Sequence, residues 1–246
     1  MHLPTLDYNK NVSDIVRADY RTADVFRKYN INYCCGGKIL LEEACLQKNI
    51  SFAEISAKLE EASRIISLPE NLHFENWRLD FLIDYIINIH HTYIKESLPA
   101  LEVNLLSFVG SHAKQFPHFT RIFELFQQIL ALLNEEIIQE EEIQFPYIKQ
   151  IDNTFRRKET YGKLFVRTLR KPLDTVDRAR QPLNNLLSEM RSITDYYQFP
   201  ANACTNHQVI FHKLREFDSD LVQHKFLENT ILYPRAIDIE RQLLLL

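Results

Sequence analysis

The chain has 246 residues, of which 46% are hydrophobic and 25% charged, and its formal net charge is −4. These values are ordinary for a globular protein and allow either one large domain or a small domain followed by a larger one. The negative charge argues against nucleic acid as the main partner. No apolar run approaches the roughly 20 residues of a membrane helix, and the opening MHLPTLDYNK lacks a signal-peptide core, so we expect a cytoplasmic protein without a membrane partner.

The residue composition favours helices over strands. Four glycines and nine prolines leave little material for hairpins. Long stretches rich in Leu, Ile, Glu and Lys take their place. We therefore predict an all-α fold.

The first part of the chain, residues 1–65, is predicted to be a small helical domain. Ser51 and Glu54 form a capping box ahead of the apolar positions Phe52, Ile55 and Leu59. The stretch SLPENLHFEN then interrupts the helical period with Pro and Asn residues and is predicted to be a linker.

Two adjacent cysteines, Cys34 and Cys35, stand inside this domain in the stretch INYCCGGKIL. Vicinal cysteines form only a strained, easily reduced disulfide, so a structural crosslink between them is the poorer interpretation. The other two cysteines, Cys45 and Cys204, look structural.

From Trp77 onward the periodicity predicts long amphipathic helices at about 77–110, 119–143, 176–197 and 206–231, forming a four-helix bundle over residues 75–246. A basic connection, residues 149–172, separates the second helix from the third. We expect it to be a solvated excursion, with a docking patch for an acidic partner as the alternative.

The predicted inward stripes carry ionisable residues. The stripe of the second helix, for example, runs Ile129, Leu133, Glu136, Glu140, Ile143. Across the bundle the ionisable positions are His91, Glu136, Glu140, Arg180, His224 and Glu228. A lone inward histidine is usually a hydrogen-bonded core residue, but burying unpaired carboxylates costs several kcal/mol each. Inward Glu and His are how carboxylate-bridged iron sites are built in bundles, so a metal site is predicted. His90, His112, His118 and His207 fall off the stripes or in loops, and we expect them at the surface or just behind the ligands.

A pattern that occurs twice in the sequence supports this prediction. The stretches EIIQEEEIQFP, from Glu136, and HKFLENTILYP, from His224, share one layout. Each has a candidate ligand, a Glu four residues later, and an aromatic–Pro pair beyond that Glu. The i,i+4 spacing puts both side chains on one helix face. We expect the aromatic–Pro pair to end each helix just past the site.

The chain resembles the iron–sulfur cluster repair di-iron proteins of the RIC type. The resemblance rests on NYCCGG at 32–37, HHTYIKESLPAL at 90–101, EEEIQFPYI at 140–148, PANACTN at 200–206 and HKFLENTILYPRA at 224–236. It implies a small Cys-Cys-Gly-Gly domain followed by a hemerythrin-like four-helix bundle. It also implies a cytosolic, often dimeric protein that restores iron–sulfur clusters after oxidative or nitrosative damage, with damaged iron–sulfur proteins as its partners.

By this resemblance His91, Glu140, His224 and Glu228 are the iron ligands, the two glutamates being bridging carboxylates. The family's second iron uses two further histidines, and here those positions hold Glu136 and Arg180. Arginine has no free lone pair and cannot ligate a metal. We therefore expect an atypical site in which one iron ion is favoured and two remain possible. Either Arg180 pairs with Glu136, or it turns to solvent and Glu136 becomes an extra ligand.

The resemblance also implies a redox or cluster-handling role for Cys34 and Cys35, on a turn that Gly36 and Gly37 make flexible. The alternative is a tight turn between helices, with one thiol buried as a small hydrophobic group.

Three functions compete at this point. The first is an iron-binding repair protein acting under oxidative or nitrosative stress. The second is a hemerythrin-like iron enzyme or sensor acting on nitric oxide, peroxide or oxygen, which would need an open coordination position and a supply of electrons. The third is a metal-free interaction module that kept the fold. The retained His and Glu pairs count against the third, whereas Glu136 and Arg180 count for it.

Overall fold

The computed structural model describes residues 7–34, 37–64, 72–169, 173 and 180–245. Within these ranges the chain is helical, apart from turns, loops and one isolated bridge between Asn11 and Leu40. The predicted all-α fold is confirmed. None of the helices described has both the length and the apolar character needed to span a membrane.

Four short helices form an N-terminal module: α1 (Val12–Ala18), α2 (Thr22–Lys28), α3 (Leu41–Lys48) and α4 (Phe52–Ser63). They surround an apolar cluster that includes Val12, Ile15, Phe26, Leu41, Ile55 and Leu59. The Ser51 hydroxyl accepts a hydrogen bond from the Glu54 N–H at 3.4 Å, so the predicted cap of α4 is confirmed. The predicted domain end at residue 65 lies outside the described residues.

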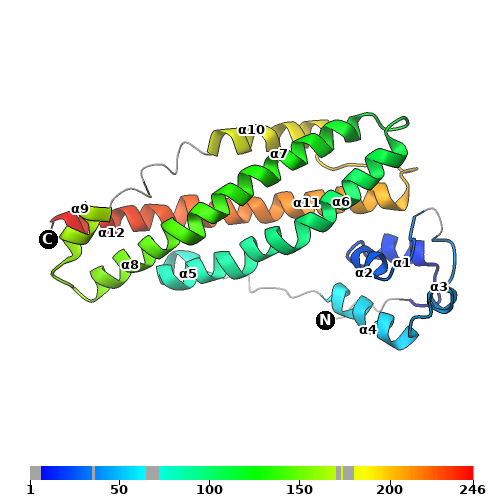
Figure 1. Ribbon diagram of the computed structural model, residues 1–246, viewed down its shortest axis with the longest axis horizontal. Coiled ribbons are helices and arrows are strands. Elements are labelled where there is room, and N and C mark those ends of the chain that lie inside the picture. Colours follow the sequence, from blue (N-terminus) through cyan, green and yellow to red (C-terminus); the bar gives the residue numbers. More distant parts are fainter. Residues whose placement is uncertain (1–6, 35–36, 65–71, 170–172, 174–179, 246) are drawn as a thin grey trace.

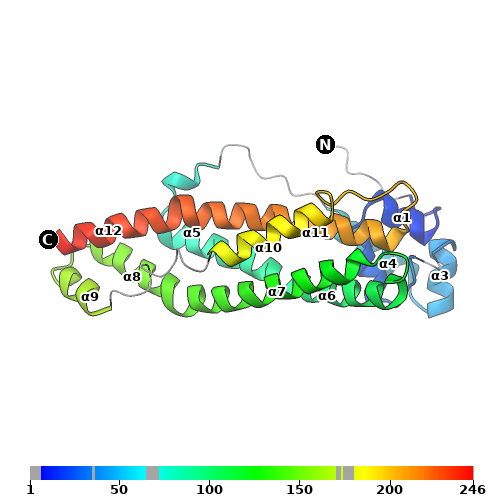
Figure 2. The same cartoon turned by 90° about the horizontal axis from the view of Figure 1, so that it is seen from above.

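The remainder of the chain forms three long helical rods, accompanied by shorter helices. The first rod comprises α5 (Leu79–Tyr85), η2 (Ile86–His91) and α6 (Thr92–His112). The second comprises α7 (His118–Gln139), η3 (Glu140–Gln144) and α8 (Phe145–Arg156), and the third α11 (Thr205–Phe226), η4 (Leu227–Leu232) and α12 (Tyr233–Leu245). The shorter helices are η1 (Phe74–Asn76), α9 (Gly162–Leu169) and α10 (Arg180–Ile193). Figures 1 and 2 both show α10 lying along α7.

The N-terminal module docks against one end of this bundle, beside α11 (Figure 1). Val209 of α11 completes the apolar cluster of the module. The Lys213 ammonium lies 2.6 Å from Asp24 Oδ2, and the Tyr20 hydroxyl donates to Glu216 Oε2 at 2.9 Å. Apolar and polar contacts therefore fix the module on the bundle together.

The prediction that an aromatic–Pro pair ends two of the helices is wrong. The second rod continues past Pro146 to Arg156, and the third past Pro234 to Leu245. Each proline is the second residue after a π-helical segment, η3 or η4, and lies in the first turn of the α segment that follows. The wide π turn shifts the hydrogen-bond register just before the ring, and proline is tolerated in a first turn.

The same π segments also change which side chains face inward. Ile143, predicted to be buried, is 46% exposed, whereas His90, which the stripe leaves out, is 1% exposed. A π turn holds more residues than an α turn and rotates the following side chains off the 3.6-residue stripe. The inward face predicted from a straight helix is therefore wrong at these positions.

The basic connection at 149–172 is only partly a solvated excursion. Residues 149–156 extend α8, and α9 packs against α12. Val166 and Ile151 are fully buried, in a cluster that also contains Leu243. The segment is rich in charged residues, but apolar residues recur among them at helical spacing. Its composition therefore suggested a solvated loop where part of the segment packs as helix. Residues 170–172 lie outside the described part.

His207 is buried in the apolar end of the bundle, contrary to the expectation of a position at the surface or behind the ligands. Its ring packs against Phe119 and Phe211, with centroids 4.8 and 4.6 Å away, and neither ring nitrogen has a hydrogen-bond partner among the described residues. Burial, helped by His118 and His112, lowers the pKa of His207 to about 4.

Replacing His207 with Leu should make the protein less sensitive to acid. The folded-state pKa is depressed, so between pH 6.5 and 4 the unfolded chain binds a proton that the folded chain does not. This lowers the free energy of unfolding progressively across that window, by up to about 3 kcal/mol. Urea midpoints at pH 7 and pH 5 should therefore differ less in His207→Leu than in the natural chain. The exposed His73→Leu serves as control, and equal pH dependence in all three proteins would contradict the prediction.

Candidate metal centre

The three π segments bring the predicted ligands to one level of the bundle. His91 is the last residue of η2, Glu140 the first of η3, and Glu228 the second of η4. His224 lies one turn before Glu228, near the end of α11. Wide π turns often occur at functional sites, because they aim side chains that a regular helix would point elsewhere.

Four buried side chains converge at this level. One ligand atom from each of His91, Glu140, His224 and Glu228 lies within 4.8 Å of the others. The Nε2 atoms of the two histidines are 3.2 Å apart. Glu228 Oε1 lies 2.8 Å from His224 Nε2, and Glu140 Oε2 lies 3.3 Å from His91 Nε2.

These residues fit a metal ion. Glu140 Oε2 has no hydrogen-bond partner among the described residues, although it is buried and close to both imidazoles. A buried carboxylate oxygen in this state is costly, and a cation shared with two imidazole nitrogens would satisfy it. Two imidazoles and two carboxylates form a donor set that iron accepts. The structure thus brings together all four of the predicted ligands.

His91 is held in position by a residue that the sequence analysis did not single out. Its Nδ1 lies 2.8 Å from Glu141 Oε1, and both oxygens of Glu141 accept from Lys95 at 2.7 Å. With the carboxylate as acceptor, Nδ1 carries the proton and the Nε2 lone pair faces the cluster, which is how metal-binding histidines are commonly oriented. In the sequence, Glu141 could have been recognised from its position directly after the predicted ligand Glu140.

Lys225 is the second residue that the sequence analysis missed. Its side chain is 17% exposed, and its ammonium lies 2.7 Å from Glu228 Oε2, 3.0 Å from Glu136 Oε2 and 3.6 Å from Glu140 Oε1. Glu136 thus has a cationic partner other than Arg180. The backbone of Arg180 begins α10, but its side chain lies outside the described residues, so a pair between Arg180 and Glu136 stays a prediction.

Glu140 and Glu228 each divide their oxygens between an imidazole and the Lys225 ammonium. Glu228 turns Oε1 to His224 and Oε2 to Lys225, and Glu140 turns Oε2 to His91 and Oε1 to Lys225. This is the pattern of a carboxylate bridging two cations, with the Lys225 ammonium at one of the two positions. Tyr233 lies beside Lys225 in this cluster, with its hydroxyl oxygen 3.2 Å from Glu140 Oε1 and 2.6 Å from Gln144 Oε1.

Burial and neighbouring charge set the protonation of the cluster. Burial raises the pKa of Glu140 well above its usual range, with Glu228 adding to the effect. Burial also opposes ionisation of Glu228, but His224 and Lys225 outweigh it and hold the pKa of Glu228 well below its usual range. Burial, together with His224, lowers the pKa of His91 to about 4, so its imidazole is neutral at pH 7. Burial opposes the charge on Lys225, yet the three carboxylates raise its pKa and keep it a cation.

His90 supports the cluster from behind. Its ring stacks on His224, with centroids 5.4 Å apart and planes within 3°, and its Nδ1 lies 2.8 Å from Asp220 Oδ1. The π turn explains how two consecutive residues, His90 and His91, can both be buried.

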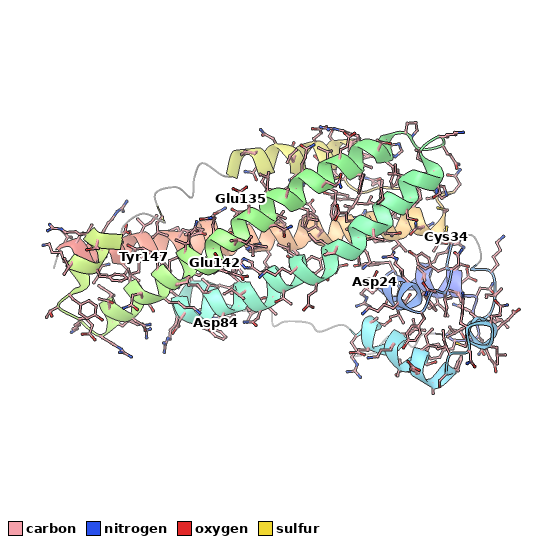
Figure 3. All side chains as sticks on the ribbon, viewed as in Figure 1. Asp24, Cys34, Asp84, Glu135, Glu142 and Tyr147 are labelled. Carbon is pink, nitrogen blue, oxygen red and sulfur yellow. The ribbon has the colours of Figure 1, made fainter. Side chains whose placement is uncertain are left out.

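The structure does not bring the cysteine motif to this cluster. Figure 3 shows Cys34 at the module end of the bundle, whereas Glu142, two residues from the ligand Glu140, lies near its middle. Cys35 and Gly36 lie outside the described residues. A Cβ atom at Gly37 would collide with the backbone of Tyr33, so this turn is too tight for any other residue.

Comparisons with known proteins show the family to which the chain belongs. Residues 8–63 match the family model ScdA_N, a domain of unknown function (DUF542). The iron–sulfur cluster repair protein YtfE of Enterobacter sp. (strain 638) is 30% identical over 233 residues, covering 92% of this chain and 96% of that protein. The chain belongs to the iron–sulfur cluster repair protein family. A probable iron–sulfur cluster repair protein of Haemophilus influenzae is 27% identical over 87% of this chain and 90% of its own length. Another family member, ScdA of Staphylococcus haemolyticus, is 26% identical over 91% of this chain and 96% of its own length.

Replacing Glu141 with Gln should weaken metal binding without disturbing the fold. Loss of the carboxylate partner of His91 removes the group that fixes its tautomer and raises its basicity, which costs about 10- to 100-fold in affinity. Anaerobic competition with a ferrous chelator measures this change, and circular dichroism checks helicity. The matched control is Glu142→Gln on the same π segment, whose side chain is exposed. Equal affinities for the two variants would show that Glu141 does not orient the ligand.

Proposed function

We propose that this protein binds iron in its bundle and helps restore iron–sulfur proteins damaged by oxidative or nitrosative stress. The observation that carries the proposal is the convergence of His91, Glu140, His224 and Glu228 in the interior of a chain of this family. The relatives are iron–sulfur cluster repair proteins, which suggests the repair activity, and the four donors offer a place where iron can be held.

The charge of the cluster favours a single ion. Metal ligands bind in their deprotonated forms, so with a metal bound Glu136, Glu140 and Glu228 count as carboxylates and both histidines as neutral. Together with the Lys225 cation, the protein groups then carry a formal charge of −2. One divalent ion beside His91 and His224 brings the sum to zero. Two would leave +2 with the ammonium in place, or +1 if the second ion displaced it. Uncompensated charge in a low-dielectric interior is expensive, so single occupancy is favoured.

Each group around the proposed ion has a definite task. Bound iron would supply a Lewis-acidic, redox-active centre that can be taken up and handed over. Glu141 holds the lone pair of His91 toward it, while Lys225 and Tyr233 hold the outer oxygens of the two carboxylates. Two-electron chemistry shared between two irons would be lost where Lys225 takes the second position.

The remaining proposals concern the whole chain. We place the N-terminal domain at residues 1–65 and the hemerythrin-like bundle at 75–246, with Cys34 and Cys35 as redox thiols. We also propose a cytoplasmic homodimer that acts on damaged iron–sulfur proteins and uses neither nucleic acid nor membrane. Sedimentation of the purified chain tests the dimer, and a monomer at micromolar concentration would count against it.

Iron content tests the one-ion proposal. After anaerobic loading, the natural chain should bind about one ferrous ion, because Lys225 supplies the second positive charge. The double variant Glu136→His, Lys225→Met removes the ammonium and adds an imidazole, so its iron content should rise toward two. Glu136→His alone keeps the ammonium and should stay near one. Close to two irons in the natural chain would refute the proposal, and none would favour a metal-free interaction module.

A reconstituted repair assay tests the function. The natural chain should restore activity to an iron–sulfur enzyme inactivated by peroxide or nitric oxide, and His224→Ala should not, because it removes a ligand. The double variant Cys34→Ser, Cys35→Ser should melt nearly as the natural chain does and yet repair poorly. The exposed His73→Ala is the control. Normal repair by the double cysteine variant would mean that Cys34 and Cys35 serve only in packing.

A further inference from the structure

Two cysteines far apart in the sequence meet where the N-terminal module contacts the bundle. The thiol of Cys34, in the module, is hydrogen-bonded to Cys204, in the loop that leads into α11. Cys204 was expected to be merely structural. This contact pairs Cys204 with Cys34, which belongs to the Cys-Cys-Gly-Gly motif, and the sequence left the role of that motif undecided.

The surrounding hydrogen bonds hold the two thiols together. The Tyr33 hydroxyl donates to Asn206 Oδ1 at 2.8 Å, and it accepts from Arg27 Nη2 at 2.9 Å. The Cys34 N–H donates to Asn32 Oδ1 at 2.9 Å. Each cysteine therefore lies within two residues of the Tyr33–Asn206 hydrogen bond, so the contact is built into the docking of the module.

Cys204 is placed where a thiolate is stabilised. It directly precedes α11, a helix of 22 residues, at the positive end of the helix dipole. The Cys34 thiol, the backbone N–H groups of His207 and Asn206, and His112 act together against burial and lower the pKa of Cys204 to about 6. A thiolate is the form of cysteine that reacts.

Small molecules can reach Cys34, the hydrogen-bonded partner of Cys204. Cys34 lines a cleft of about 340 Å³ between the module and the bundle, together with Asn104, Ser107, His112 and Asn206. Cys204 is half-buried beside it, whereas Cys45 is 2% exposed inside the apolar cluster of the module. The cleft admits an oxidant of the size of hydrogen peroxide and favours this pair over Cys45.

We propose that Cys34 and Cys204 are an oxidation site that closes into a reversible disulfide and links the N-terminal module covalently to the bundle. The oxidant class is a hydroperoxide, with hydrogen peroxide as the simplest member. This assigns the redox partner of Cys34 to the bundle and not to the neighbouring Cys35.

The reaction balances with one peroxide for each disulfide. The Cys204 thiolate attacks one peroxide oxygen, forming an S–O bond as the O–O bond breaks, and the departing hydroxide takes the Cys34 proton and leaves as water. The Cys34 thiolate then attacks Cys204 Sγ, forming the S–S bond and expelling hydroxide, which a solvent proton converts to water. Two sulfurs lose two electrons in total, and the peroxide gains them.

Peptide mapping tests the proposal on the full-length chain. The protein is treated with equimolar hydrogen peroxide, blocked with N-ethylmaleimide and digested with trypsin without reduction, and a parallel sample contains a chelator to suppress iron-catalysed oxidation. Cleavage after Lys and Arg places Cys34 and Cys35 together on residues 29–38, Cys204 on 192–213 and Cys45 on 39–48. The expected product joins 29–38 to 192–213 and disappears on reduction.

Single substitutions identify the sulfur involved. Cys35→Ser and Cys45→Ser should retain the linked product, and Cys34→Ser and Cys204→Ser should lower it about tenfold or more. A closed bond within 29–38, a link that survives in Cys34→Ser, or no link to 192–213 would overturn the proposal.

A second measurement does not depend on how the Cys204 variant folds. The alkylation rate of Cys204 is followed against pH in the natural chain and in Cys34→Ser. The natural chain should show a midpoint near pH 6, and loss of the Cys34 donor should move it upward. Equal midpoints would mean that the two thiols do not interact in solution, and this result would overturn the proposal while leaving the proposed repair function untouched.

Discussion

Two carboxylates buried at one level of a helical bundle, Glu140 and Glu228, with the partly exposed Glu136 beside them, are the constraint on which the rest of this structure depends. Glu136, Glu140 and Glu228 cannot remain ionised there without positive partners. Lys225 supplies one positive charge, and the outward oxygens of the carboxylates turn to it. The inward oxygens turn to His91 and His224, which leaves a place for one more cation. The arrangement therefore supports both the proposed iron site and the proposed preference for a single ion.

The π turns are the structural means by which this cluster is assembled. One occurs in each long rod, and together they divide the apolar interior into a cluster around α6, α7, α10 and α11 and another around α5, α8, α9 and α12. The register shift in each turn lets Pro146 and Pro234 follow without ending the helix. The polar level thus lies between two well-packed apolar halves, which exclude water from both sides.

The N-terminal module contributes its chemistry at a different place. Its docking on α11 brings Cys34 against Cys204 at the end of the bundle, while the carboxylate cluster lies near the middle (Figure 3). The two sites share one helix, because α11 begins directly after Cys204 and carries His224 near its other end. A redox event at the module and iron binding in the bundle can therefore be changed independently by substitution.

The all-α fold and the shared helix face of His224 and Glu228 follow from local spacing in the sequence, and the family resemblance adds His91 and Glu140 to the predicted ligands. His224 and Glu228 share a helix face at i,i+4 whatever the rest of the chain does. The folded structure determined several features that the sequence pattern did not predict, through the π turns and the packing between distant segments. It exposed Ile143, buried His90 and His207, and placed Glu141 behind His91. It also placed Lys225 next to Glu136 and Cys204 next to Cys34. A long side chain next to a ligand can point to solvent or to the interior. The charges on the neighbouring helices determine which orientation has the lower free energy.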